Sequence, residues 1–144
     1  MTSMAAGPEV VDAPSQPPVL VLRAIGLGDA LTGVPALRGL RRLVAPRPVL
    51  LAAPEHLGRW FTDLALVDGW VATADLDAEP PGRGLGRHDA VDLHGNGPAS
   101  RDLLAAGSPQ RLLAWWPPPG PGGGWRAEEH EVRRWCRLVG AWGA

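Results

Sequence analysis

The chain has 144 residues, a length typical of one domain with a modest hydrophobic core. Its 14 basic and 15 acidic residues nearly balance, and the formal net charge of −1 argues against a nucleic-acid-binding protein. A single cysteine, Cys136, excludes an intrachain disulfide and fits a reducing compartment.

The sequence contains no membrane-spanning or secretory pattern. No apolar run reaches the length of about 20 residues that a transmembrane helix needs, and the amino terminus lacks the regions of a signal peptide. These features predict a cytoplasmic protein. Residues 1–17 are small, polar and rich in proline, and they predict a disordered leader before a folded domain over residues 18–144.

The folded domain opens with a pattern typical of a strand, a glycine turn and a helix. Residues 19–22 form a short apolar run, as expected of a strand that is covered on both faces. Gly26 and Gly28 follow, and glycine lets the backbone turn sharply or lets another molecule approach it. Asp29 then stands at the start of a helix. Pro35 fits this helix if the regular part begins near residue 32; otherwise the helix starts at Asp29 and kinks.

Four further strands and three further helices are expected. The strands lie at residues 49–53, 70–73, 89–93 and 111–115, and the helices at residues 54–66, 98–106 and 127–142. The helix over residues 54–66 is expected to bury Leu57, Trp60, Phe61 and Leu64. The last helix is expected to bury Val132, Trp135, Cys136 and Val139, and to expose Arg133, Arg134 and Arg137. Segments 75–86 and 117–124 are rich in proline and glycine and predict loops.

This alternation of strands and helices predicts an α/β fold. We expect a Rossmann-like three-layer α/β/α arrangement around a mostly parallel sheet of about five strands, with right-handed crossovers. In such sheets, ligands bind in the crevice beyond the carboxyl ends of the strands. A second glycine turn, residues 92–97, follows the fourth strand. A ligand site is therefore expected where the turns after the first and fourth strands meet.

Asp29 has two interpretations. Its residue type and position favour a helix cap or a turn former. Alternatively, a carboxylate at a crevice that is partly shielded from water acts as a general base, which removes the proton from a hydroxyl as its oxygen attacks.

The turn after the fourth strand also has two interpretations. His94, Gly95 and Asn96 form either a plain polar turn or a set of donors for a sugar or a phosphate. Ser100 and Arg101 lie in the next helix, near its amino terminus, where they favour an anionic or oxygen-rich ligand.

Two other motifs match only in part. Residues 26–31 resemble a dinucleotide fingerprint, but Leu31 replaces the third glycine, which is expected to spoil helix–strand packing, and no acid ends the second strand. His88, Asp92 and His94 alternate on one side of the fourth strand, as metal ligands can. His88 lies at the opposite end from the crevice, so we expect no metal site.

The motifs in order resemble glycosyltransferase family 9, the ADP-heptose:lipopolysaccharide heptosyltransferase family. The first runs from Arg23 to Asp29 (Arg-Ala-Ile-Gly-Leu-Gly-Asp) and is followed by Pro-Ala-Leu at residues 35–37. Further matches are Asp-Leu-His-Gly at residues 92–95, then Ser100, then residues 111–115, and the helix around residues 129–135. The resemblance extends over residues 19 to about 142.

The resemblance implies the amino-terminal half of a GT-B fold, in which two Rossmann-like halves face each other across a cleft. It implies inverting transfer of a sugar from a nucleotide sugar to a hydroxyl of a cell-envelope glycan or glycolipid, without a catalytic metal or other cofactor. Asp29 matches the family's proposed base. Gly26 and Gly28 would shape the cleft, and His94, Gly95, Asn96, Ser100 and Arg101 would line the acceptor side. Peripheral association with the inner face of a membrane is compatible with this function.

The chain ends at Ala144, where the family continues into its nucleotide-sugar half. The expectation is therefore an acceptor-side fragment that is inactive by itself, since positioning both reactants is most of the catalysis. Two alternatives stay open. One is a non-catalytic Rossmann-like binding module, and the other is a nucleotide-binding oxidoreductase domain.

Overall fold

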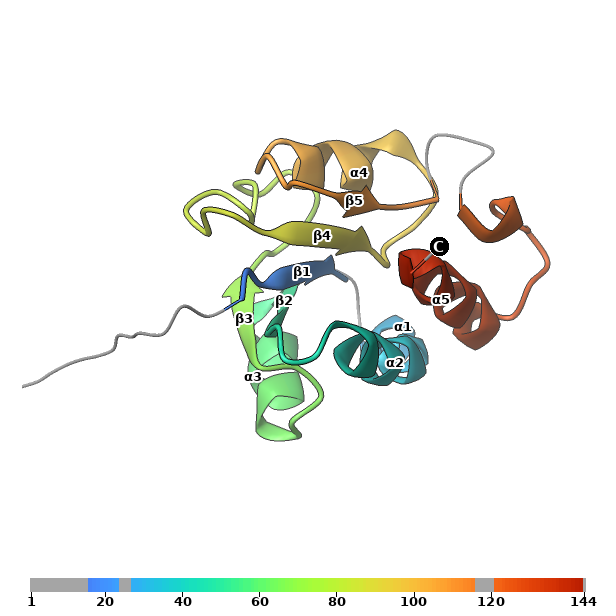
Figure 1. Ribbon diagram of the computed structural model, residues 1–144, viewed down its shortest axis with the longest axis horizontal. Coiled ribbons are helices and arrows are strands. Elements are labelled where there is room, and N and C mark those ends of the chain that lie inside the picture. Colours follow the sequence, from blue (N-terminus) through green and yellow to red (C-terminus); the bar gives the residue numbers. More distant parts are fainter. Residues whose placement is uncertain (1–15, 24–26, 116–120, 144) are drawn as a thin grey trace, which may run out of the picture.

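A five-stranded parallel sheet forms the centre of the fold (Figure 1). The structure, a computed structural model, describes residues 16–23, 27–115 and 121–143. Within them the strands are β1 (Val19–Leu22), β2 (Val49–Ala53), β3 (Gly69–Ala72), β4 (Asp89–Asp92) and β5 (Leu112–Leu113). Their order in the sheet is β3-β2-β1-β4-β5, and all four pairings are parallel. The predicted Rossmann-like α/β fold is confirmed.

β1 lies at the centre of the sheet, and its sequence explains this place. All four of its side chains are fully buried. Val19 and Val21 point to one face, and Leu20 and Leu22 point to the other, because side chains alternate along a strand. An uninterrupted apolar run is the pattern that a strand covered on both faces requires.

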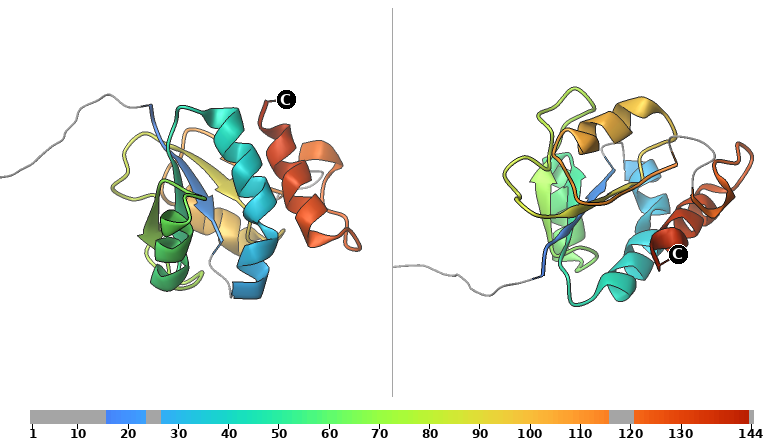
Figure 2. Two further views of the ribbon diagram at one scale, coloured as in Figure 1. Left: turned by 90° about the horizontal axis from the view of Figure 1, so that it is seen from below. Right: turned by 45° about the horizontal axis from the view of Figure 1, so that its top comes forward.

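Helices cover both faces of the sheet. They are α1 (Leu27–Thr32), α2 (Val34–Val44), α3 (Glu55–Asp63), α4 (Pro98–Ala105) and α5 (Glu131–Gly140), with short 3₁₀ turns η2 (Pro121–Gly123) and η3 (Ala141–Gly143). Side chains of α2, α3 and α5 share one core cluster with β1 and β2, whereas α4 joins the cluster on the opposite face. α2 and α5 lie side by side in both views of Figure 2. No helix connects β3 to β4; residues 73–88 cross as turns instead, and Leu76 and Leu85 pack on the α4 face.

The break between α1 and α2 follows from Gly33 and Pro35. α1 ends at Thr32, and α2 begins at Val34 with Pro35 in its first turn. Proline is tolerated there because the first N–H groups of a helix have no intrahelical acceptor to lose. The chain thus takes the first of the two predicted arrangements, preceded by a separate short helix.

The buried face of α3 differs from the prediction. Trp60 and Leu64 are 41% and 53% exposed, so two of the four residues expected in its buried stripe lie outside. A Cβ atom at Gly58 would come within 2.6 Å of Trp70 in β3. α3 therefore packs on the sheet through its glycine, which turns Leu57 and Phe61 inward and Trp60 outward.

The start and the buried face of α5, the last α-helix, also differ from the prediction. α5 begins at Glu131 instead of residue 127, because the His130 ring accepts a hydrogen bond from the Val132 N–H and caps the helix. Arg134, expected in solvent, is buried, whereas Cys136, expected in the core, is exposed. The carbonyl oxygens of two preceding residues hold the Arg134 guanidinium, and this contact sets the rotation of α5.

Candidate functional site

The candidate site lies where β1 and β4 end side by side. These two strands pair in register up to Leu22 and Asp92, and the chain leaves them in different directions along the sheet. This reversal of strand order is the switch point at which open α/β sheets bind ligands. Arg23 and Asp29, the described residues on either side of the first turn, are joined by a hydrogen bond, and Arg23 also donates to Leu93 after β4.

Asp29 lies inside α1 and is not its cap. It is the third residue of that helix, and its side chain is exposed. Among the described residues, its carboxylate makes no hydrogen bond or ion pair. A helix amino terminus favours a negative charge nearby. The carboxylate thus lies beyond the carboxyl end of β1 and is accessible from outside.

Arg23, the first residue after β1, ties the walls of the site together. Its guanidinium donates hydrogen bonds to the carbonyl oxygens of Asp29 and Leu93, and to the Thr32 hydroxyl at 2.9 Å. Its cationic carbon lies 5.0 Å from the ring centre of Trp135 in α5. Burial lowers the pKa of Arg23 to about 10, against the opposing effect of nearby carboxylates. Arg23 stays charged at neutral pH and fixes the backbone at Asp29.

Asp92, the last residue of β4, forms the floor of the site. One of its oxygens accepts a hydrogen bond from Ser100 Oγ at 2.6 Å, and the other accepts from the His94 N–H at 2.9 Å. Burial raises the pKa of Asp92 to about 6, although these hydrogen bonds, that of the Gly95 N–H and the charge of Arg23 oppose the shift. Asp92 therefore orders the turn that follows β4.

His94 contributes a polar group without a protein partner. Its ring is half-buried, and Nδ1 is covered but has no hydrogen-bond partner within residues 16–23, 27–115 and 121–143. Burial and the charge of Arg23 lower the pKa of His94, so the ring is neutral at neutral pH. A neutral imidazole carries one acceptor nitrogen and one donor nitrogen. His94 therefore brings a polar nitrogen, unpartnered within the described residues, to this edge of the sheet.

The glycines at this edge of the sheet leave room beside the backbone. A Cβ atom added at Gly28, Gly95 or Gly97 would meet nothing within 4 Å, and none of the three has the left-handed backbone that favours glycine. Gly107, by contrast, packs against Gly82, where a Cβ atom would lie 2.7 Å from the neighbouring backbone. The open positions suit the close approach of another molecule.

The other predicted site residues lie close by in sequence but differ in their surroundings. Ser100 is buried, and its hydroxyl is donated to Asp92. Arg101 is partly exposed in α4, with a guanidinium nitrogen 3.6 Å from a carboxylate oxygen of Asp102. Asn96 is exposed. Gly26 lies outside the described residues.

Reasoning from the sequence did not assign roles to Arg23 and Asp92. Arg23 directly follows the apolar run of β1, and a charged residue at the end of such a run is the signal that could have identified it. Asp92 ends β4, which also begins with an aspartate, so its pattern gives no such signal. Leu31 also needs correction: its side chain is 46% exposed, so it does not disturb the packing of α1 on the strand.

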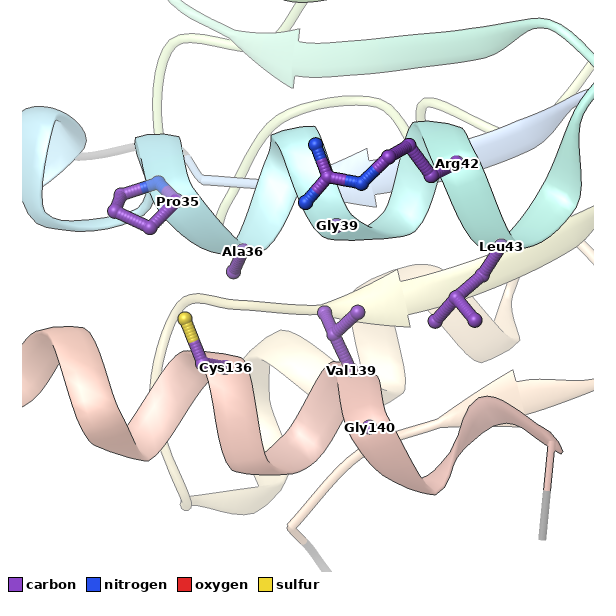
Figure 3. A pocket seen from close by; sticks show the side chains of 8 residues that line it. All are labelled: Pro35, Ala36, Gly39, Arg42, Leu43, Cys136, Val139 and Gly140. Carbon is purple, nitrogen blue, oxygen red and sulfur yellow. The ribbon is translucent and has the colours of Figure 1, made fainter.

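The candidate site is located neither by a cluster of metal ligands nor by a hollow in the surface. In the described part of the chain, no three His, Cys, Asp or Glu side chains gather closely enough to hold a metal ion. A hollow of about 280 Å³ lies between α2 and α5 (Figure 3), lined mainly by apolar and small residues with Arg42 and the Cys136 thiol. We locate the site at the switch point because the unpartnered carboxylate and imidazole gather there.

The fold is that of a Rossmann-like α/β domain, and its switch point is the candidate ligand site. No protein-family model and no curated protein match the sequence. Among solved structures, the chain is similar to the E. coli heptosyltransferase WaaC with ADP, with a TM-score of 0.65 and 15% sequence identity. The match covers 88% of this chain and 47% of WaaC, so the chain spans about half the length of that protein. At this identity, the likeness shows the fold.

None of the helices in the described ranges combines the length and the apolar character needed to cross a bilayer.

Proposed function

We propose that the chain is the acceptor-binding part of an inverting glycosyltransferase of the heptosyltransferase type, with Asp29 as the general base. The observation that carries the proposal is the exposed Asp29 carboxylate, which has no partner in the described structure and stands at the switch point. A group that served only as a helix cap would accept N–H groups of α1. The shared fold with a heptosyltransferase supports the same assignment.

In the proposed reaction, Asp29 accepts the proton of an acceptor hydroxyl as the hydroxyl oxygen attacks the anomeric carbon of the donor sugar. The bond from that carbon to the nucleotide diphosphate breaks as the new bond forms, so the configuration inverts. Arg23 holds the Asp29 backbone in place, and the neutral ring of His94 offers an acceptor for a second hydroxyl. Gly28, Gly95 and Asn96 line the space for the sugar, and Arg101 lies at its outer side.

The donor is a nucleotide sugar, which a second Rossmann-like half would bind across the cleft. That half would also cover Asp29, and removing water strengthens its action as a base. The acceptor is a glycan or glycolipid of the cell envelope, which implies a cytoplasmic protein that meets the inner face of the membrane. We propose no metal or other cofactor for the transfer step.

The test joins this chain to the nucleotide-sugar half of a heptosyltransferase and compares Asp29→Asn with Asp63→Asn. Asp63 is another exposed acid, at the end of α3, so both variants lose the same charge. We expect Asp29→Asn to lower transfer by about 10²- to 10⁴-fold, the usual contribution of a general base. Acceptor affinity, measured by calorimetry with a lipopolysaccharide core oligosaccharide, should stay near that of the parent. Equal activity of the two variants would show that Asp29 is structural.

A non-catalytic binding module is the second candidate, because the likeness to WaaC extends to the fold and not to sequence. It predicts acceptor binding but no transfer by the joined protein, with or without Asp29→Asn. An oxidoreductase domain predicts NADH binding, which a fluorescence titration measures.

A further inference from the structure

Three arginines of α2 surround a hollow that no part of the proposed reaction uses. Arg38, Arg41 and Arg42 line it together with Leu64, Ala65 and Leu66, which follow α3, and its volume is about 280 Å³. We call it the arginine hollow. We propose that the arginine hollow binds a phosphoryl group, carried either by a small molecule or by a lipid headgroup.

Two of the three arginines have uncompensated charges. Arg38 and Arg42 form no ion pair or side-chain hydrogen bond within the described residues. They are four residues apart on one helix, where like charges repel by a few tenths of a kcal/mol. α2 contains no acidic residue that could offset them. The helix dipole favours a cation in the last turn, which accounts for Arg42, whereas Arg38 lies a full turn earlier. A bound dianion would remove this repulsion.

The third arginine is already fixed in place. Arg41 donates to Asp68 Oδ1 at 2.6 Å and to the Ala65 carbonyl oxygen. Asp68 in turn accepts a hydrogen bond from the Val49 N–H at 2.8 Å. This chain of contacts leaves the walls of the hollow pre-organised. Guanidinium groups bind phosphate oxygens in pairs, and a fixed wall lowers the cost of ordering the other two arginines.

The arginine hollow is separate from the candidate site. Asp68 and Val49 stand at the amino ends of β3 and β2, whereas Asp29 and His94 follow the carboxyl ends of β1 and β4. The two sites therefore lie at opposite edges of the sheet. Binding in the arginine hollow does not depend on the proposed transferase function, and either can fail without the other.

The rim of the hollow adds an apolar element. Leu64, which lines the hollow, is 53% exposed. An exposed leucine beside arginines suits a phosphoryl group that carries an apolar neighbour, as a lipid does. The arginines alone would also hold a soluble phosphate. The shared chemistry is the phosphoryl group, and the experiment separates the two sources.

The test uses the full chain and two probes, inorganic phosphate by calorimetry and phosphatidylglycerol in phosphatidylcholine vesicles by sedimentation. The double variant Arg38→Gln, Arg42→Gln removes the unpaired charges and leaves Arg41 with Asp68. We expect the dissociation constant of the bound probe to rise about tenfold or more, as for the loss of two charge-assisted contacts. The matched control is Arg59→Gln, Arg83→Gln, which removes the same charge from exposed pairs elsewhere. The control should bind like the parent.

Each outcome decides the proposal. Saturable binding of inorganic phosphate that the double variant weakens supports a soluble ligand. Binding of anionic vesicles alone, weakened in the same way, supports a lipid headgroup. If neither probe binds, or if both variants weaken binding equally, the arginine hollow is not a site. Urea unfolding of the double variant serves as the fold check, and its midpoint should equal or exceed that of the parent because the removed charges repel.

Discussion

At the scale of single residues, the candidate site depends on charges that are placed before any ligand arrives. Arg23 is buried and keeps its charge, and it holds the Asp29 carbonyl at one wall and the Leu93 carbonyl at the other. Such a residue acts through the backbone that it fixes, so it positions the proposed base without contacting the acceptor. Asp92 and Arg23 are both buried at this edge of the sheet, and the free-energy cost of burying a carboxylate and a guanidinium is consistent with a functional site.

Asp92 gives a prediction for pH. Its folded pKa of about 6 lies above the ordinary value of 3.8, so the folded protein keeps a proton that the unfolded chain has released between about pH 4 and pH 6. The free energy of unfolding contributed by Asp92 therefore falls as pH rises through this window. Asp92→Asn removes this titration and keeps an acceptor for the His94 N–H. We expect the free energy of unfolding of the variant to exceed that of the parent by about 2 kcal/mol at pH 7. At pH 4 the two free energies should be nearly equal.

Urea unfolding at pH 4, 5, 6 and 7 measures the difference between the two proteins. His94 has a lowered pKa and so an opposite slope, because its stabilising neutral form is lost as pH falls below its ordinary value. This contribution is common to both proteins and cancels in the difference. A difference that does not change between pH 4 and pH 7 would mean that Asp92 is not the titrating group.

At the scale of elements, α5 is held by contacts that precede it in the chain. Arg134 donates to the carbonyl oxygens of Arg126 at 2.7 Å and Ala127 at 3.1 Å, and its cation lies 3.8 Å from the ring centre of Trp125. Trp135 then packs edge-on against Trp125 and covers Arg23. The docking of α5 thus closes the wall of the candidate site opposite α4.

Arg134→Met tests this docking. The substitution leaves two carbonyl oxygens without a donor and removes the cation above Trp125, so we expect a loss of about 2 to 3 kcal/mol in the free energy of unfolding. Arg133→Met is the matched control, since Arg133 is exposed on the neighbouring position of the same helix. The control should change stability by less than about 0.5 kcal/mol. Equal effects of the two substitutions in urea unfolding would contradict the role given to Arg134.

At the scale of the whole molecule, the strand order reverses between β1 and β4, and the fold matches about half of a heptosyltransferase. In the proposed function, the residues described here can hold an acceptor and accept its proton, but they include no nucleotide site that we can assign. Transfer depends on bringing both reactants together, which accounts for most of the rate.

The chain alone should therefore bind an acceptor oligosaccharide and show no measurable transfer from ADP-heptose. Calorimetry measures the first property, and release of ADP measures the second. Addition of a nucleotide-sugar half should restore release of ADP only when the acceptor is present. Turnover by the chain alone would contradict the proposed division between acceptor and donor halves.

The strands and the fold class could be predicted from the sequence, because both depend on the local pattern of apolar and polar residues. Residues 19–22 and 49–53 are short apolar runs, the pattern of a strand that is buried on both faces. Strands that alternate with helices along the chain predict a parallel sheet. The same topology predicted a ligand site beyond the carboxyl ends of β1 and β4. For Pro35 the sequence left two arrangements open, and the structure takes the one that places it in the first turn of α2, where no helical hydrogen bond is lost.

The orientations of the helices were decided by tertiary contacts. The indole of Trp70 fills the space above Gly58, so α3 turns its glycine to the sheet and exposes Trp60. The hydrophobic periodicity of the helix cannot show this contact, because Trp70 lies 12 residues further along the chain. Arg134 is buried because carbonyl groups from the preceding loop are within its reach, whereas hydrophobic pattern assigns an arginine to solvent. Sequence by itself determined the fold class, because local pattern sets the strands and helices, and it predicted where a candidate site would lie. The roles of Arg23 and Asp92 came only from the folded structure, since a buried charge becomes stable only when the chain brings its partners to it.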